Sequence, residues 1–374
     1  MCMVFFSVLK IGPKISPISR NLQTCCTMNK NNGQEDSLKK PFTIAIPMAG
    51  LGTRMRPQTW SKPKPLIHLA GCTVLDYVLN QFQSLPKFDD AHFVLILGPN
   101  QEDQVVPFMQ SNHSDKIVHY VIQEEMRGQS HALYLAREYL QGPMLMCFSD
   151  TLIETDLAFL EKEQVDGIAW VKAVPDPRRF GVAEVGKDGL IHRLIEKPDQ
   201  VDNNLAVVGF YYFKNGANLM DAIQTQIEED ISLKNEYFLV DAINILIQNG
   251  ATMRVNPVKV WLDAGKPDAL LETNRYLLEH GNDNSEESAK TSGNTIIPPV
   301  YIHPEAQVTH SVIGPHVSVG AEAVITDSIL KNTIVEQEAS ISNMVLENSL
   351  IGRSAAVRGR SEAMNIGDNS WIEI

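Results

Sequence analysis

A group of basic residues follows a glycine turn near the start of the chain. The segment IPMAGLGTRMRPQTWSKPKPLI, residues 46–67, is called the basic arm below. It leaves an apolar run through Gly50 and Gly52, and such a turn lets backbone N–H groups approach an anion without obstruction by side chains. The cations that follow are Arg54, Arg56, Lys62 and Lys64. The basic arm is predicted to surround a bound polyphosphate, with Arg54 and Lys64 as its charged groups.

Two well-known phosphate motifs do not fit the basic arm. It has no Gly-x4-Gly-Lys-Ser/Thr sequence, and Met55 stands where the dinucleotide fingerprint places its third glycine. The chain of 374 residues carries a formal net charge of −13, so its surface as a whole repels nucleic acid. An anion must therefore be captured by a local basic site, and we expect no nucleic-acid partner.

Two carboxylates stand at the ends of predicted strands. The run MLMCFSD ends in Asp150, and the run VWLD ends in Asp263, much later in the chain. Open α/β sheets bind ligands at the carboxyl edge of their strands, and two carboxylates there can hold one Mg²⁺ between phosphate oxygens. A single aspartate in this position is commonly a cap or turn residue, so it is the pair that predicts a metal site.

Short apolar runs alternate with helical patterns from Phe42 onward. The runs FTIAIPMA, FVLILG, IVHYVIQ and MLMCFSD are typical of buried strands, and later runs such as GIAWVKAV and LAVVGFYYF are too. Between the early strands, two helical stripes consist of Val74, Leu75, Val78, Leu79 and Phe82, and of Leu133, Ala136 and Leu140. The alternation predicts an α/β domain whose mostly parallel sheet is covered on both faces.

A repeat follows residues 281–295, which are nearly devoid of apolar side chains and are predicted to be a linker. Residues 312–327, 328–343 and 344–359 align in register, and a fixed period with aliphatic and alanine columns predicts stacked coils of a β-helix. The expected inward columns are Ile313/Ile329/Val345, Val319/Val335/Ile351, Ala323/Ala339/Ala355 and Ile325/Ile341/Val357. A preceding coil is one residue out of step and contributes Ile302, Ala306 and Val308.

The segment from about Phe42 to His280 resembles the sugar-1-phosphate nucleotidyltransferases, in particular the glucose-1-phosphate thymidylyltransferase-like group with an added β-helix. The family's arm reads Gly-x-Gly-Thr-Arg, Pro-x-Thr and Pro-Lys-Pro-Leu, and the sequence GLGTRMRPQTWSKPKPL contains all three parts. The resemblance implies a Rossmann-like nucleotide-binding fold followed by a left-handed parallel β-helix. It also implies transfer of a nucleotidyl group from a nucleoside triphosphate to a sugar 1-phosphate, with release of pyrophosphate.

The resemblance further assigns the residues of the site. Catalytic roles fall on Arg54, Lys64 and Lys197, and nucleotide-binding roles on Ala49, Gly50, Gly52, Thr53, Gln123 and Gly128. The sugar phosphate is assigned to Gly181, Glu196, Lys197 and Gly209, and Mg²⁺ to Asp150 and Asp263. Gln123 has an amide donor and acceptor that suit a base edge, although its loop also fits a surface turn. Glu196 and Lys197 also fit an exposed ion pair. Thr151 stands where many relatives carry Asn, which leaves open the contact beside Asp150.

Charge alone accounts for the expected mechanism. A sugar phosphate is largely a dianion near neutral pH because the second pKa of a phosphate ester is about 6, so no general base is needed. Repulsion between the two anionic substrates is the obstacle, and Arg54, Lys64, Lys197 and Mg²⁺ would offset it and stabilise the leaving pyrophosphate. Glucose 1-phosphate with dTTP or UTP is the expected pair, and mannose 1-phosphate with GTP is the alternative.

The sequence leaves two alternative functions to compare with nucleotidyl transfer. A catalytically silent regulatory subunit of the same fold predicts loss of a cation or a metal carboxylate, whereas all of these residues are present. An acyltransferase in the β-helix would use His303, His310 or His316 as a base, but only about four coils are predicted. We expect the β-helix to serve in oligomerisation or regulation, because its faces and open ends pack readily against copies of itself.

The remaining features bound the organisation of the chain. Residues 1–40 are expected to be a disordered N-terminal extension, with Met28 as an alternative start and a transit peptide as an alternative reading. The domain boundaries are predicted at 41–280, 281–295 and 296–374. The five cysteines fit no zinc pattern, and their odd number suits a reducing cytoplasm better than a disulfide framework. No segment approaches the ~18 apolar residues that span a membrane.

Overall fold

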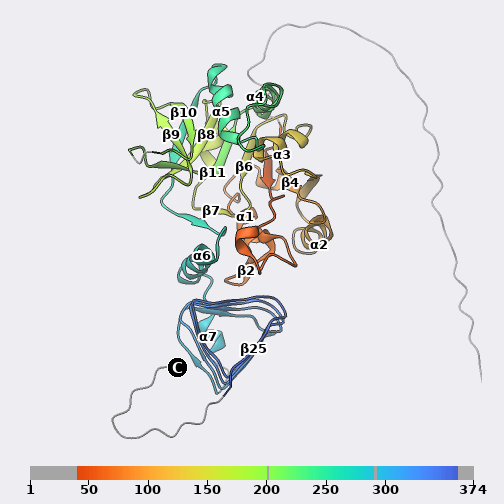
Figure 1. Cartoon of the computed structure of the whole chain (residues 1–374), viewed down its shortest axis with the longest axis vertical. Helices are drawn as coiled ribbons and strands as arrows, with labels where there is room; N and C mark the ends of the chain where they lie inside the picture. Colours follow the sequence, from red (N-terminus) through yellow and green to blue (C-terminus); the bar gives the residue numbers. More distant parts are fainter. Residues whose placement is uncertain (1–39, 200–201, 290–292, 361–374) are drawn as a thin grey trace, which may run out of the picture. The chain divides into compact units, whose positions relative to one another are not determined.

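The computed structural model describes residues 40–199, 202–289 and 293–360 (Figure 1). The predicted N-terminal extension therefore lies, apart from its last residue, outside the described residues. Among the helices in those ranges, none combines the length and the apolar character that a membrane crossing requires.

A nine-stranded sheet forms the centre of the first domain. Its strands are β1 (Thr43–Pro47), β4 (His92–Leu97), β5 (Ile117–Ile122), β6 (Met144–Cys147), β8 (Gly167–Ala173), β9 (Gly181–Val185), β10 (Ile191–Glu196), β11 (Leu205–Phe213) and β12 (Met253–Pro257). The predicted early strands pair in parallel. β1 lies between β4 and β6 and is parallel to both, and β4 also pairs in parallel with β5. These strands are nearly all apolar since both faces of the sheet are covered.

The second half of the sheet is antiparallel around the long strand β11. It pairs antiparallel with β6, β8 and β9, and β9 pairs antiparallel with β10, whereas β12 joins β8 in parallel. The sheet is therefore mixed, and the expectation of a mostly parallel sheet holds only for its first half. Alternation of apolar residues does not distinguish the two directions in a sheet buried on both faces, which is why the sequence pattern missed this.

Helices cover the sheet on both sides. They are α1 (Val74–Asn80), α2 (Glu102–Asn112), α3 (Gln129–Leu135), α4 (Gly216–Glu228), α5 (Leu239–Gln248) and α6 (Pro267–Glu279), with short 3₁₀ turns at Phe88–Asp90 and Ala158–Lys162. Both predicted stripes are buried, on α1 and on the turn that follows it, and on α3 and its continuation. Ile44 and Ile46 face the core under α1, and Ala45 faces the core under α3, α4 and α5.

The second domain is the expected left-handed β-helix, built of three parallel four-stranded sheets (Figure 1). The first sheet holds β14 (Thr295–Ile296), β17 (Val312–Ile313), β20 (Ile329–Lys331) and β23 (Val345–Glu347). The second holds β15 (Val300–Ile302), β18 (Val317–Val319), β21 (Ile334–Val335) and β24 (Leu350–Ile351). The third holds β16 (Gln307–Thr309), β19 (Val324–Thr326), β22 (Ser340–Ser342) and β25 (Ala356–Arg358).

Three of the four predicted columns are supported by the register. Val319, Val335 and Ile351 stack in the second sheet, and Ile325, Ile341 and Val357 stack in the third. Ala323 and Ala339 are fully buried in the core of the β-helix. The coil predicted one residue out of step is also confirmed, since Ile302 pairs with Val319 and Val308 with Ile325.

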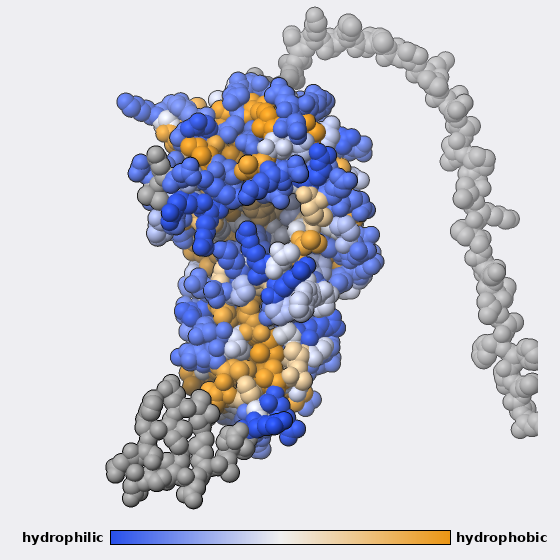
Figure 2. Space-filling model, in the orientation of Figure 1, coloured by the Kyte–Doolittle hydropathy of each residue, from blue (hydrophilic) through white to orange (hydrophobic). Residues whose placement is uncertain are grey.

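The first predicted column is wrong after Ile313. Ile313 pairs with Leu330, and Leu330 pairs with Leu346, so these leucines face the interior. Ile329 and Val345, which were expected inside, are 47% and 74% exposed. The chain has one residue more between β17 and β18 than between β20 and β21, and a one-residue shift turns every side chain of a strand to its other face. On the part of the β-helix that grey atoms leave visible, hydrophobic residues gather (Figure 2).

The segment predicted to be a linker contains structure of its own. A single-turn helix, α7 (Ser285–Ser288), lies within it, and the carboxylate of Asp283 accepts hydrogen bonds from the backbone N–H groups of Ser285 and Val300, both at 2.9 Å. Strand β14 begins at Thr295, inside the predicted linker. Short polar turns held by Asp and Ser carry no apolar signal, so their sequence resembles that of a flexible connection.

Candidate active site

The glycine turn of the basic arm leaves the sheet at the carboxyl end of β1. The Met48 N–H donates to the Ile96 carbonyl at 2.8 Å, which keeps the chain on the sheet just before the turn. The Ala49 carbonyl lies against Gly98, where an added β-carbon would come within 2.6 Å of it. Gly50 is exposed, and an added β-carbon would meet nothing within 4 Å. The backbone at Gly50 is therefore open to a ligand.

The turn closes at Gly52 and continues into a 3₁₀ turn, η2 (Thr53–Met55). Gly52 has a φ of 58°, in the left-handed region that favours glycine, and its carbonyl accepts a 2.8 Å hydrogen bond from the Thr59 hydroxyl. Met55 is fully buried, whereas Thr53 and Arg54, the first two residues of η2, are exposed. One buried side chain thus fixes the turn and leaves the Arg54 guanidinium at the surface.

The second half of the basic arm brings Lys64 to Asp150. Lys64 begins the 3₁₀ turn η3 (Lys64–Leu66), whose Pro65 and Leu66 are buried. The Lys64 ammonium contacts the Asp150 carboxylate, and the Lys64 side chain is only 13% exposed. Arg56 stays exposed, whereas Lys62 turns away to the β-helix, as described below.

The two predicted metal carboxylates meet because β7 (Thr151–Ile153) pairs antiparallel with β13 (Trp261–Asp263). In this register Asp263 lies opposite Thr151, and the Ala264 N–H donates to the Asp150 carbonyl at 3.0 Å. The Gly265 N–H donates to Asp263 Oδ1 at 2.6 Å. A β-carbon on Gly265 would lie 2.7 Å from Asp263 Oδ1, 3.1 Å from Asp150 Oδ2 and 3.3 Å from Lys64 Nζ. Three charged groups therefore converge on one glycine.

The electrostatics of this convergence suit a cation. Burial, and then the charge of Asp150, raise the pKa of Asp263 above its ordinary value. A cation between the two carboxylates would relieve both effects, and hard divalent cations prefer such oxygen ligands. The residues present thus fit Mg²⁺, with phosphate oxygens and water left to complete its shell.

Thr151, which stands where many relatives carry Asn, has a structural role. Its side chain is buried, and its hydroxyl donates to the Val208 carbonyl at 3.0 Å. This hydrogen bond ties the residue after Asp150 to β11. Gly209, next along β11, has a φ of 80°, and an added β-carbon would lie 2.2 Å from the Phe148 ring. Gly209 thus gives room to the side chain two residues before Asp150.

Of the residues predicted for the sugar phosphate, Gly181, Glu196 and Lys197 lie together where β9 begins and β10 ends, whereas Gly209 lies in β11. Gly181 pairs with Glu196, and a β-carbon on Gly181 would lie 3.3 Å from Glu196 Oε2. Lys197 Nζ lies 3.3 Å from Glu196 Oε1 and 4.9 Å from the centre of the Phe238 ring. The Lys197 side chain is half exposed, and its backbone has a φ of 46°. The prediction missed a second acidic residue here, Asp241 on α5; burial, and then the charge of Glu196, raise its pKa.

The loop predicted to bind the base is folded by its own side chains. The Gln123 amide group is buried, and its Nε2 lies 3.1 Å from the Gly128 carbonyl and 3.1 Å from His131 Nδ1. Gly128 has a φ of 92°, and an added β-carbon would lie 2.5 Å from the Tyr237 carbonyl. Gly128 is therefore required by the packing of the loop against residue 237, a partner that no local pattern indicates.

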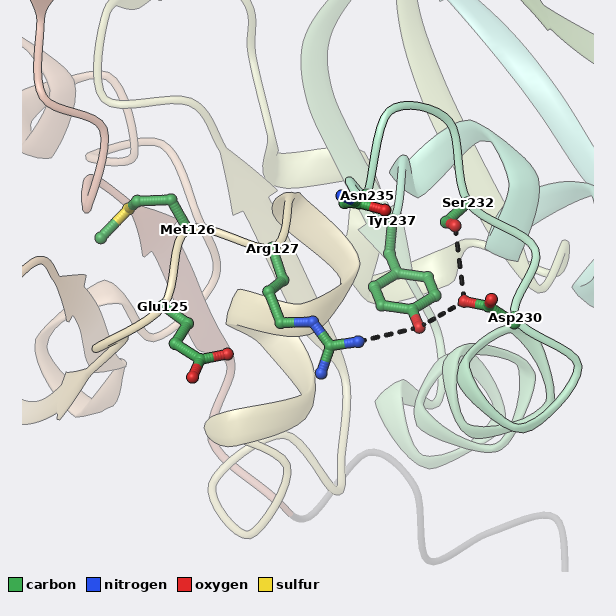
Figure 3. Close-up of a pocket in the computed structure, with 7 residues that line it drawn as sticks. All are labelled: Glu125, Met126, Arg127, Asp230, Ser232, Asn235 and Tyr237. Carbon is green, nitrogen blue, oxygen red and sulfur yellow. Dashed lines mark hydrogen bonds between the residues drawn. The ribbon is translucent and has the colours of Figure 1, made fainter.

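An open hollow of about 600 Å³ lies beside this loop (Figure 3). The Arg127 guanidinium donates to the Tyr237 hydroxyl at 3.1 Å, and that hydroxyl donates to the Asp230 carboxylate at 2.9 Å. Glu125, Met126, Ser232 and Asn235 complete the lining. The wall formed by residues 230–237 comes from the connection between α4 and α5, so the sequence reasoning missed it. Asp150 and Asp263 are not among the residues that line the hollow.

The three histidines of the rival acyltransferase interpretation are distributed over different turns of the β-helix. His316 Nε2 lies 2.8 Å from Glu279 of α6, and His310 Nδ1 lies 3.6 Å from Asp327. His303 Nδ1 lies 3.8 Å from Glu305. Each of them is thus next to a different carboxylate.

The first domain is thus a mixed α/β sheet covered by helices, with a glycine turn at the carboxyl end of β1 close to cations and to the two carboxylates that the pairing of β7 with β13 brings together. Residues 45–280 match the family model described as nucleotidyl transferase, and the chain belongs to this family.

The relatives agree with this family. The chain is 28% identical over 260 residues to the bifunctional protein GlmU of Methanococcus vannielii, with 67% of this chain and 59% of that protein covered. It is 28% identical over 308 residues to a glucose-1-phosphate thymidylyltransferase of Streptomyces griseus, with 76% and 84% covered. It is 31% identical over 238 residues to the low-salt glycan biosynthesis nucleotidyltransferase Agl11 of Haloferax volcanii, with 62% and 64% covered.

A solved structure shares the fold. It is a Bacillus anthracis protein provisionally named a glucose-1-phosphate thymidylyltransferase, in complex with a sucrose; the TM-score is 0.54 at 22% identity, with 63% of this chain and 95% of that chain covered. The chain thus spans little more than half the length of the GlmU relatives and most of the length of the thymidylyltransferases.

Proposed function

We propose that this protein transfers a nucleotidyl group from a nucleoside triphosphate to a sugar 1-phosphate. The observation that carries the proposal is the convergence of Lys64, Asp150 and Asp263 on Gly265, at the end of the arm that starts with an open glycine turn. Membership of the nucleotidyl transferase family supports it. The product would be a nucleotide sugar, which places the enzyme in nucleotide-sugar biosynthesis.

The reaction needs one bond to form and one to break. A phosphate oxygen of the sugar 1-phosphate attacks the α-phosphorus of the triphosphate, and the bond from that phosphorus to the β-phosphate bridging oxygen breaks, so pyrophosphate leaves with the bonding electrons. The attacking phosphate is already ionised, so no proton need be removed. Lys197 beside Glu196 would hold the sugar phosphate, and Arg54 and Lys64 would bind the triphosphate.

Asp150 and Asp263 would hold Mg²⁺, which would neutralise phosphate charge while the pyrophosphate leaves. Lys64 now lies against Asp150. With a triphosphate bound, Lys64 would contact its phosphates. The nucleotide base would lie against the loop of Gln123 and Gly128, next to the hollow of Figure 3.

Glucose 1-phosphate with dTTP or UTP is the pair we propose, because the chain covers 84% of the length of a glucose-1-phosphate thymidylyltransferase. Mannose 1-phosphate with GTP is the alternative pair. The test is pyrophosphate release by the purified chain with each pair, with Mg²⁺ and with EDTA. Release with one pair that depends on Mg²⁺ is the expected result. Binding of a triphosphate without release from any pair would favour the silent regulatory subunit, and failure to bind any triphosphate would refute the proposal.

We also propose that the β-helix joins copies of this chain. The support is the outward-facing aliphatic pair Ile329 and Val345, adjacent in the register of the first sheet and both exposed. Exposed aliphatic residues on a flat sheet face are typical of contacts with another protein surface.

A further inference from the structure

A buried carboxylate of the β-helix contacts the basic arm. Glu336 follows β21 and is only 2% exposed. Lys62 Nζ lies 2.7 Å from Glu336 Oε2, and the two side chains are 10% and 3% exposed. This ion pair is therefore largely removed from water, as the Lys64 side chain is, whereas Arg54 and Arg56 of the basic arm are exposed.

The same carboxylate reaches the other side of Lys64. The His68 N–H donates to Glu336 Oε1 at 3.2 Å, and His68 Nδ1 lies 3.5 Å from Oε2. Lys62 and His68 stand two residues before and four residues after Lys64. Glu336 thus binds both ends of the short segment that carries Lys64, and the buried residues of η3 lie between them.

A second set of contacts continues this interface. The Ala70 N–H lies 2.9 Å from Asn274 Oδ1 of α6 and 3.1 Å from the Ser318 hydroxyl of the β-helix. The Ser318 hydroxyl donates to Asn274 Oδ1 at 2.6 Å, and all three residues are buried. Ile334 of the β-helix belongs to the same apolar core as Leu66, Ile67 and Leu69, which follow Lys64. The β-helix therefore packs on the basic arm with polar and apolar contacts alike.

Removing one partner of a buried ion pair leaves the other charge buried without compensation, which is far more costly than losing an exposed pair. Lys62 and His68 hold the pKa of Glu336 below its ordinary value, against the effect of burial. Glu336 is therefore a charged group whose loss would release Lys62 and the His68 backbone together. Misplacement of a catalytic group by about 1 Å can cost roughly a hundredfold in rate.

We propose that Glu336 is a positioning residue, which sets the place of Lys64 through Lys62 and the His68 backbone. The β-helix is then a working part of the phosphate site. This inference rests on the proposed function for its kinetic consequence, although its structural content can be tested without turnover.

The kinetic test compares Glu336→Gln with Glu338→Gln. Glu338 lies on the same coil, but its carboxylate is exposed and bonds to Ser354 and Arg353 within the β-helix. We expect Glu336→Gln to lower kcat roughly ten- to hundredfold with little change in the KM for the sugar phosphate, and Glu338→Gln to match the wild type. Lys62→Gln should give a similar loss, and the double variant should lose little more than either alone.

Kinetics within about twofold of wild type for a folded Glu336→Gln would overturn the inference, on the usual scale of positioning effects. An equal loss in Glu338→Gln would also overturn it, since that would mean general damage to the β-helix. Additive losses in the double variant would show that Lys62 and Glu336 act separately, contrary to the inference.

Hydrogen–deuterium exchange supplies the readout that needs no activity. In Glu336→Ala the amides of residues 62–68, including the His68 N–H, should exchange faster, while those of β1 stay protected. Unchanged protection of this segment would overturn the inference even if the variant were slow. If the wild type turns over no substrate pair, the proposed function fails, and the exchange result still decides whether Glu336 holds the basic arm.

Discussion

The Lys64 ammonium lies against the Asp150 carboxylate, although 86 positions separate the two residues in the chain. The contact joins the basic arm to the strand-end carboxylates and makes one site of two sequence motifs. Because Asp150 is also a proposed Mg²⁺ ligand, Lys64 occupies a place that a metal would take. This relationship decides what substitutions at the site should do.

Lys64→Met should lower turnover by about two to three orders of magnitude, the usual effect of removing a group that stabilises developing charge. The fold should survive, since the long apolar side chain of Met fills much of the same space. Steady-state kinetics and circular dichroism check both statements. Lys331→Met is the matched control, because Lys331 is exposed and pairs with Glu347 on the β-helix. Near-normal turnover of Lys64→Met would remove Lys64 from the site.

Asp263→Asn should abolish the response to Mg²⁺ and yet stabilise the ligand-free protein at pH 7. The pKa of Asp263 is raised, so the protonated form stabilises the folded state; this contribution is present in acid and is lost as the pH rises through the raised pKa. Asn cannot ionise and escapes that loss. In EDTA, the melting temperature of the variant should exceed that of the wild type by an amount that grows as the pH rises above the ordinary pKa of an aspartate, about 4, and levels off above the raised pKa. A lower melting temperature at pH 7 would contradict the electrostatic account.

Gly265→Ala should displace the two carboxylates. The added methyl group would lie 2.7 Å from Asp263 Oδ1 and 3.1 Å from Asp150 Oδ2, closer than packed atoms tolerate. We expect a loss of Mg²⁺-dependent stabilisation in thermal melts together with a loss of turnover. Gly352→Ala is the control, since an added β-carbon there meets nothing within 4 Å. If Gly265→Ala retained its full response to Mg²⁺, the convergence on Gly265 would not be a metal site.

Gly128→Ala should raise the KM for the triphosphate more than it lowers kcat. The backbone has a φ of 92°, and the methyl group would lie 2.5 Å from the Tyr237 carbonyl, so the loop that carries Gln123 must move. Gly189→Ala separates the strain of a positive φ from the contact with Tyr237. Gly189 also has a positive φ, of 80°, but an added β-carbon there meets nothing within 4 Å. Nucleotide titrations of both variants provide the measurement. Equal behaviour of the two variants would mean that contact with Tyr237 does not matter.

Val345→Glu should dissociate an oligomer formed through the first sheet of the β-helix. Val345 is 74% exposed, so the substitution costs little in the isolated chain, whereas a buried charge would oppose association. Light scattering after size-exclusion chromatography gives the mass of each form. Lys331→Met serves as the control on the same sheet. A monomeric wild type, or a variant with unchanged mass, would speak against this face as the interface.

The features that local sequence predicts are those that local chemistry determines. The glycine turn, Asp263 as the last residue of β13, and the columns under Val319 and Ile325 all follow from residue type and spacing, whereas Asp150 lies in the turn between β6 and β7. Apolar alternation could not reveal the antiparallel pairing of β11, because a sheet covered on both faces has the same apolar pattern in either direction.

Long-range partners account for what the sequence did not predict. The contact of Gly128 with Tyr237 and the ion pair of Lys62 with Glu336 join segments far apart in the chain. The sequence near Gly128 or Lys62 does not indicate either partner. The extra residue between β17 and β18 places Ile313 opposite Leu330 and not opposite Ile329, because segments of equal length cannot account for a longer turn. A longer turn changes the aliphatic pattern only by shifting it along the chain by one residue.

The place of Glu336 in the β-helix restricts how that domain can change in length. Its coil follows those that begin at α7 and β14. A coil inserted before β21 would therefore move the Glu336 carboxylate away from Lys62. Coils added beyond β25 would leave the contact between Glu336 and Lys62 in place, whereas removal of the coil that holds β24 would remove the Leu350 carbonyl, which accepts a 3.3 Å hydrogen bond from Gln58 Nε2 of the basic arm. We therefore expect the β-helix to tolerate coils added after β25, whereas the number of coils between the linker and Glu336 should stay fixed.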